Sequence, residues 1–318
     1  MLLGVIGNVM FFFTSGYLIF LNNQIFSIND ITLFIRKRLF RIFPLYWISL
    51  LYSLYLSQSY NFFFAAAHFF GLQLVFTSLE KRLLWFIGCI TVYYLIYPLI
   101  VLKTQSNKTI IFRSLAIFLL FLILRMQIGI FNANIFAYLP VFVLGILVSK
   151  NKLVFQKNLL KIRNISLICS IICFYWFLKT RPPMLHDNSQ FGEAGIIYML
   201  SVHIPKVIFG IALIFSLYWI AHRYIQSSSI KNTITKCAIA SYPVYLFHGF
   251  AVSFFQSYTA ILLGLPILFT IFYYVQIEYN TIISYLFPKR DKPFVESYSS
   301  KKLYQAKPSK AEDPRKSK

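Results

Sequence analysis

The chain is dominated by apolar segments that follow one another, with only short polar breaks, from residue 3 to residue 277. They approach the length of about 20 residues that an α-helix needs to cross the hydrocarbon core of a bilayer. Because a helix satisfies its own backbone hydrogen bonds in lipid, such a series predicts an all-α, polytopic transmembrane helical bundle. We expect apolar helices at 3–21, 43–58, 62–78, 84–102, 111–124, 135–149, 164–178, 196–222, 238–257 and 259–277.

The composition agrees with a membrane protein and excludes an ordinary soluble domain. Hydrophobic residues make up 58% of the chain and charged residues 13%, whereas soluble domains carry about 25% charged residues. The net charge of +22 raises the question of nucleic acid. Its cations lie in short loops between apolar segments and in the tail rather than on one folded face, so we reject nucleic acid as a partner.

The interpretation of segment 62–78 decides the topology. If this segment crosses the membrane, the basic loops fall on both sides without order. If it is re-entrant or interfacial, about nine crossings remain, and 25 of the 31 Lys and Arg residues lie on one side. Since basic loops face the cytoplasm, the second model predicts a multi-pass inner-membrane protein with its N-terminus outside and its C-terminus inside.

The sequence divides into two parts. Residues 1–277 form the expected transmembrane domain, and residues 278–318 form a basic, polar tail that we expect to be disordered in the cytoplasm. The four cysteines are free of metal-site spacing, so we predict no metal site, and packing is the favoured interpretation. They are Cys89, Cys169, Cys173 and Cys237.

Three polar residues near the end of the chain share one helical stripe. Ser241, Tyr245 and His248 stand at positions i, i+4 and i+7, which places them on one face. A polar stripe on an apolar membrane helix faces protein or water rather than lipid. These side chains could orient a sugar hydroxyl or relay a proton. A satisfied polar interface between helices explains the same spacing equally well.

Arg38 and Arg41 lie in the basic run before segment 43–58. Being three residues apart, they share one face at the cytoplasmic end of the helix that we expect to begin near Phe43. Arginine suits bidentate phosphate contacts, as a phosphorylated donor such as coenzyme A would need. Anchoring in lipid headgroups is the alternative explanation.

For several other residues, packing or a position at the membrane interface is a better explanation than a role in function. Ser15 has no base nearby in sequence, and Gly16 permits close approach of another helix. Trp85 fits the aromatic belt of a membrane interface. His203 and Lys206 could line an outward cavity, although the lysine could equally reach the headgroups.

Four segments together resemble the integral-membrane acyltransferase 3 family. Phe12-Phe13-Thr14-Ser15-Gly16-Tyr17-Leu18-Ile19 is similar to its FF-x-SG-aliphatic segment, and Arg38-Leu39-Phe40-Arg41-Ile42-Phe43-Pro44-Leu45-Tyr46 to its R-x-x-R-aromatic-P-x-Y stretch. Trp85-Phe86-Ile87-Gly88 with Tyr94-Leu95-Ile96-Tyr97-Pro98 resembles its W…Y-L-x-x-P segment. The helix from Ser241 to His248 resembles its S-Y-x-x-Y-L-x-H helix.

The resemblance implies an enzyme that moves an acyl group, most often acetyl, to sugars of surface polysaccharides or lipid-linked glycans. It implies an acyl-CoA donor substrate at Arg38 and Arg41 and no bound cofactor. Because the usual base is absent, we assign the catalytic roles to His248, Tyr245 and Ser241 of the stripe, with His203 as the less favoured substitute base. Membrane lipids and a glycan acceptor would be the partners, and the sequence does not specify an oligomer. The family usually opens with a further helix carrying an Arg and the catalytic His, and we expect this chain to start after it.

Two rival hypotheses come from different functional classes. A truncated, non-catalytic relative could bind a glycan or a partner protein with the same helices. A flippase for lipid-linked sugars would instead carry charged residues deep within several central helices. Only Lys206 and the histidines approach that pattern, so the flippase is the less favoured of the two.

Overall fold

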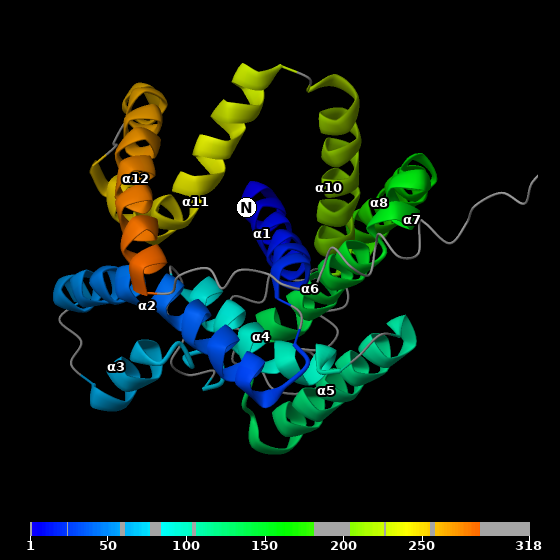
Figure 1. Cartoon of the computed structure of the whole chain (residues 1–318), viewed down its shortest axis with the longest axis horizontal. Helices are drawn as coiled ribbons and strands as arrows, with labels where there is room; N and C mark the ends of the chain where they lie inside the picture. Colours follow the sequence, from blue (N-terminus) through cyan, green and yellow to red (C-terminus); the bar gives the residue numbers. More distant parts are fainter. Residues whose placement is uncertain are drawn as a thin grey trace, which may run out of the picture.

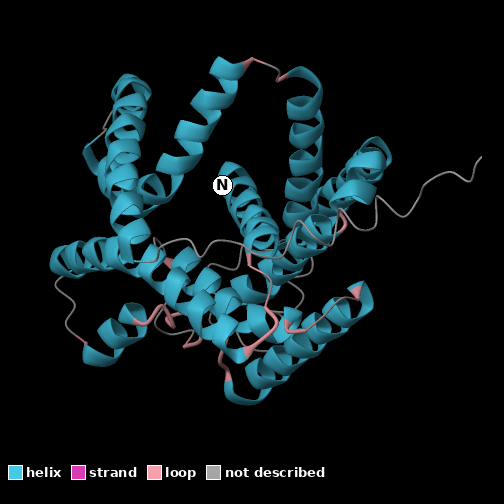
Figure 2. Ribbon diagram, viewed as in Figure 1, coloured by secondary structure: helices cyan, strands magenta, loops and turns pink. Residues whose placement is uncertain are grey.

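The computed structural model describes residues 2–23, 25–57, 61–76, 84–103, 106–180, 204–225, 227–254 and 258–286. These residues form helices joined by loops and turns, with no strand among them (Figure 2). The expected all-α architecture is therefore confirmed for this part of the chain. Its helices are α1 (Leu2–Asn22), α2 (Ile28–Ser57), α3 (Phe62–Phe69), α4 (Trp85–Val101), α5 (Asn107–Ile128), α6 (Ala133–Lys150), α7 (Lys152–Lys157), α8 (Leu159–Thr180), α10 (Ile204–Tyr224), α11 (Ser228–Phe254) and α12 (Tyr258–Leu286).

Helices α1 and α6 approach each other closely, and two glycines make that approach possible. A Cβ atom on Gly16 would lie 2.1 Å from the carbonyl oxygen of Phe142, and one on Gly145 would lie 2.2 Å from that of Phe13. No larger residue fits at these points, because real Cβ contacts are not this short. The expectation that Gly16 allows a close helix crossing is confirmed.

Helix α4 lies at the centre of the molecule, beneath α1 and beside α2 and α6 (Figure 1). Most of its residues are buried. Its rings pack with those of α1 and α6 around Phe12, whose centroid lies 4.7 Å from Phe86, 5.3 Å from Tyr93 and 4.8 Å from Tyr138. Trp85 stacks on Tyr138 at 5.7 Å, so it contributes to this aromatic core.

Helix α2 begins at Ile28, so the expectation of a helix starting near Phe43 is wrong. The reason is a cap at its N-terminus. The backbone N–H of Ser27 donates to the Asp30 carboxylate at 2.9 Å, and the N–H of Asp30 donates to the Ser27 hydroxyl at 3.2 Å. This reciprocal pair satisfies backbone donors of the first turn and starts the helix before the basic run. Arg38 and Arg41 therefore lie within α2.

Helices α11 and α12 lie side by side and are fastened to α2 by hydrogen bonds from their tyrosines (Figure 1). The Tyr242 hydroxyl donates to the carbonyl of Ile42 at 2.7 Å. The Tyr279 hydroxyl donates to the carbonyl of Phe40. Pro44 has no N–H to offer that carbonyl four residues earlier, so Tyr279 compensates for the proline inside α2.

Helix α3 has eight residues and spans about 12 Å, too short to cross a bilayer core of about 30 Å. It is held against α2 by Tyr46, which donates to the carbonyl of His68 at 2.7 Å, and by Trp47, which donates to that of Phe69 at 2.9 Å. The interpretation of segment 62–78 as re-entrant or interfacial stays a prediction, and its residues 77–78 lie outside the described part of the chain.

Two helices meet the length and composition of a membrane span among the described residues, namely α5 and α6. Two shorter apolar stretches, Trp85–Val101 and Val207–Ala221, add to the membrane character. The number of nine crossings stays a prediction. Helix α12 continues to Leu286, past the predicted domain boundary at 277, and the rest of the expected tail lies outside the described residues.

Candidate functional site

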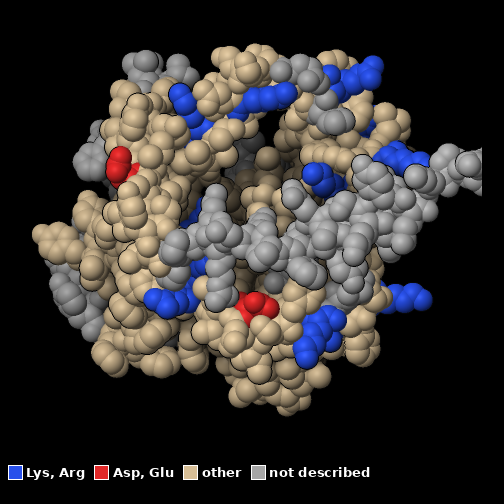
Figure 3. Space-filling model, viewed as in Figure 1, with Lys and Arg blue, Asp and Glu red and all other residues tan. Residues whose placement is uncertain are grey.

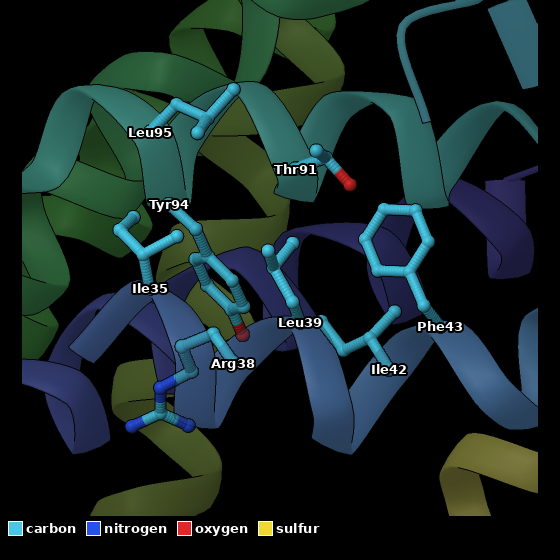
Figure 4. A pocket seen from close by; sticks show the side chains of 8 residues that line it. All are labelled: Ile35, Arg38, Leu39, Ile42, Phe43, Thr91, Tyr94 and Leu95. Atoms are coloured by element: carbon cyan, nitrogen blue, oxygen red, sulfur yellow. The ribbon is translucent and has the colours of Figure 1, made fainter. Parts of the chain in front are cut away.

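A narrow crevice separates α2 from α4 and contains one of the two predicted phosphate-binding arginines (Figure 4). Its volume is about 10 Å³, the space of about one water molecule. Arg38 lies at one end and Thr91 at the other in Figure 4. The residues that line it are Ile35, Arg38, Leu39, Ile42, Phe43, Thr91, Tyr94 and Leu95.

Three segments that the sequence singled out meet at Tyr94 of α4. The Ser15 hydroxyl of α1 lies 3.0 Å from the Tyr94 hydroxyl. The guanidinium of Arg38 lies 5.7 Å from the centroid of the Tyr94 ring and 5.6 Å from that of Phe34. These distances are in the range of cation–π attraction, which holds the charged end of Arg38 in place.

Arg38 and Arg41 differ in exposure although both belong to α2. Arg38 is half-buried against α4, and Arg41 is exposed. A guanidinium presents several donors in a rigid fork, so one held and one accessible arginine can together contact a phosphate at the surface. The sequence predicted this pairing of charges but not the aromatic support of Arg38.

The three residues of the polar stripe make mostly local contacts on α11. The Ser241 hydroxyl donates to the carbonyl of Ala238 at 2.7 Å, within the same helix. The Nδ1 atom of His248 lies 2.6 Å from the carbonyl oxygen of Tyr245, and their rings are 5.7 Å apart. Tyr245 packs edge-on against Phe86 of α4, with centroids 5.0 Å apart. The stripe thus meets α4 through Tyr245.

Arg38 and the stripe contact different parts of α4. Arg38 lies against Tyr94 and Tyr245 against Phe86, eight residues earlier. Eight residues correspond to about 12 Å along a helix axis. The structure therefore does not bring Arg38 and His248 together, and the two predicted parts of the site lie about two helical turns apart along the central helix.

Several contacts at the site were missed from sequence. Thr91 is only 4% exposed, and its hydroxyl has no hydrogen-bond partner among the described residues. The hydroxyl of Ser49 donates to the carbonyl of Leu246 at 3.0 Å and joins α2 to the stripe helix. The hydrogen bond of Tyr242 to α2 was also missed. A polar hydroxyl in an apolar helix, next to Ser241, was the sequence signal that could have predicted it.

Among the residues that the structure describes, the remaining candidates do not form a second site. His68 is fully buried, with its Nδ1 atom 2.9 Å from the carbonyl oxygen of Phe64. His203 and the side chain of Lys206 lie outside the described part of the chain. Cys89 is buried as expected, whereas Cys169 and Cys237 are exposed, so core packing does not explain these two. Within the described ranges, His, Cys, Asp and Glu form no group able to hold a metal.

The fold and the site of the described residues define an all-helical membrane protein with two arginines on one helix, one of them held by aromatic rings, and a polar stripe on another. The family model of the acyltransferase domain, Acyl_transf_3, matches residues 1–277, so the chain belongs to this acyltransferase family. The family and the apolar helices indicate a membrane protein with acyltransferase activity. Searches of curated proteins and of solved structures gave no match.

Proposed function

We propose that this protein is a membrane-bound O-acyltransferase that carries an acetyl group from acetyl-CoA to a hydroxyl of a surface polysaccharide or lipid-linked glycan. The convergence of Ser15, Arg38 and Tyr94 carries the proposal, because it joins three segments of the matched domain at a charged crevice. The cell membrane is the proposed location, with the N-terminus outside and the arginines near the cytoplasmic side.

Arg38 and Arg41 bind the phosphates of the donor in this proposal. The rings of Phe34 and Tyr94 hold the Arg38 guanidinium, while Arg41 is accessible from the surface. Coenzyme A joins its phosphates to the thioester by a long flexible arm. The separation of about 12 Å along α4 between the Arg38 and Tyr245 contacts suits such a donor better than a compact one.

His248 acts as the base that takes the proton from the acceptor hydroxyl. Its Nδ1–H can donate to the Tyr245 carbonyl, which leaves Nε2 as the proton acceptor. The hydroxyl oxygen then attacks the thioester carbonyl, the C–S bond breaks, and the coenzyme A thiolate takes a proton. Tyr245 and Ser241 lie on the same stripe, and the Ser241 hydroxyl would turn from the carbonyl of Ala238 to donate toward the developing oxyanion.

The test compares O-acetylation of surface polysaccharide in a deletion strain complemented with this chain or its variants. We expect His248→Ala and Arg41→Ala each to reduce acetylation by more than tenfold at equal membrane abundance. Arg36→Ala is the matched control, because Arg36 shares the basic run but not the face of Arg38 and Arg41. Modification at the native level by both site variants would refute these assignments.

A non-catalytic relative is the second candidate, and one observation favours it. The polar groups of Ser241 and His248 both have acceptors within their own helix, as structural polar residues do. This alternative predicts glycan binding without acetyl transfer. Complementation that never restores acetylation, even with the native chain, would support it.

A further inference from the structure

Helices α5 and α6 enclose an apolar groove that the acyltransferase site does not use. Its volume is about 260 Å³. These two helices are also the clearest candidate spans among the described residues. The groove is lined by Ile111, Ser114, Leu115, Phe118, Leu139, Pro140, Val143, Leu144 and Leu147.

The lining is suited to hydrocarbon. The Ser114 hydroxyl, its one polar side-chain group, donates to the carbonyl of Ile110 at 2.7 Å and so offers little to a polar ligand. Ile111 and Leu115 are 51% and 53% exposed, so the groove opens on the outer surface of α5. On α5 the lining runs from Ile111 to Phe118, about 10 Å along the axis. That length covers most of one leaflet of a bilayer whose core is about 30 Å thick.

Two lysines follow, in sequence, a pair of asparagines at one end of the groove. The side chain of Asn107 donates to that of Asn151 at 3.1 Å, which joins the start of α5 to the end of α6. The side chain of Asn151 also donates to the carbonyl of Leu147, a groove residue, at 2.8 Å. Lys108 and Lys152 directly follow these asparagines, and both are exposed.

The segment that contains Lys108 and Lys152 has no acidic side chain to neutralise them. Residues 81–186 contain no Asp and no Glu. Basic side chains at a membrane surface attract anionic lipids. An apolar groove that covers most of one leaflet and has two lysines near one end fits a lipid with a chain and a phosphate better than a purely apolar partner.

We propose that the groove between α5 and α6 binds one acyl chain of an anionic phospholipid, with its phosphate held by Lys108 and Lys152. The α5–α6 pair would then have a lipid as part of its packed structure in the membrane. This site is separate from Arg38, Arg41 and the α11 stripe.

Native mass spectrometry of the full chain in detergent tests the proposal, with phosphatidylglycerol and phosphatidylcholine added separately. We expect the native chain to retain phosphatidylglycerol at least tenfold more tightly than phosphatidylcholine. The double variant Lys108→Gln/Lys152→Gln should lose this preference. The double variant Lys157→Gln/Lys161→Gln removes the same charge on α7 and α8 and should keep it.

A second pair of variants tests the chain-binding part. Leu115→Trp should fill the groove and weaken the binding of both lipids about tenfold. Leu119→Trp, one turn further along the exposed face, should leave the binding of both lipids unchanged. Size-exclusion profiles check that each variant stays folded. Equal affinity of the native chain for the two lipids, unchanged binding by Leu115→Trp, or a dimer that covers α5 and excludes lipid would overturn the proposal.

Discussion

Single residues at the centre of the molecule combine a structural contact with a charge. The ring of Tyr94 makes a cation–π contact with the Arg38 guanidinium, and its hydroxyl forms a hydrogen bond with the hydroxyl of Ser15. The ring and the hydroxyl can be separated by substitution, because phenylalanine keeps the ring and removes the hydroxyl. Tyr94 therefore allows the donor-site contact and the α1–α4 contact to be tested independently.

Tyr94→Phe should lower the free energy of unfolding by about 0.5–1.5 kcal/mol, the usual net value of one hydrogen bond. Ser15→Ala should cost a similar amount, and the double variant no more than the larger single loss, because both remove the same bond. Denaturation in detergent measures all three. Fully additive losses would show that the two hydroxyls do not interact.

Arg38 should tolerate lysine poorly, because a lysine is a compact point charge and cannot reproduce the planar guanidinium at two rings. We expect Arg38→Lys to raise the KM for acetyl-CoA by about tenfold and to leave kcat within about threefold. Steady-state kinetics on purified membranes measure the two constants. An unchanged KM would remove Arg38 from donor binding.

At the scale of helices, the crossing of α1 and α6 sets how closely the central elements pack. Gly16→Ala would force its Cβ atom against the carbonyl of Phe142. Such overpacking typically costs about 1–3 kcal/mol. Thermal unfolding should detect a clear loss for Gly16→Ala. Gly7→Ala is the control in the same helix, since a Cβ atom there meets nothing within 4 Å; equal losses would contradict the account.

The start of α2 depends on its cap, and it sets the position of the basic run. Asp30→Ala removes the acceptor for the Ser27 and Phe26 N–H groups, which lie 2.9 and 3.1 Å from the carboxylate. Loss of a cap typically costs about 1 kcal/mol. We expect a loss of that size with local fraying, measured as faster hydrogen exchange over residues 28–33. Unchanged exchange there would show that the cap does not hold this end.

The sequence predicted elements better than contacts. The lengths of the apolar segments identified α1, α4, α5 and α6 to within a few residues. An apolar segment in lipid must satisfy its own backbone hydrogen bonds, and a helix does so. The apolar pattern misplaced the start of α2, because the basic run interrupts that pattern within a helix that begins at the Ser27–Asp30 cap.

The candidate site could be predicted only in part. Arg38, Arg41 and the α11 stripe follow from local spacing, but their separation along α4 depends on how helices distant in sequence pack. The link from Tyr242 to the carbonyl of Ile42 joins residues 200 positions apart. The periodicity of residues within one helix cannot predict a contact between two helices so distant in sequence.

For the whole molecule, the orientation decides which compartment supplies the donor. The distribution of Lys and Arg predicts an outside N-terminus and a cytoplasmic C-terminus. On the face in Figure 3, basic side chains also predominate over acidic ones among the described residues. Reporter fusions to the two ends should give opposite locations, and two ends in one compartment would contradict the assignment of the donor side.

The most direct test separates donor binding from transfer in the purified protein. Acetyl-CoA affinity and single-turnover acetyl transfer to a glycan acceptor would be measured for the native chain, Arg41→Ala and His248→Ala. We expect Arg41→Ala to weaken acetyl-CoA binding by more than tenfold. His248→Ala should bind acetyl-CoA within about twofold of the native chain and lose transfer by more than tenfold. Native affinity in Arg41→Ala together with native transfer in His248→Ala would contradict the division of the site between α2 and α11.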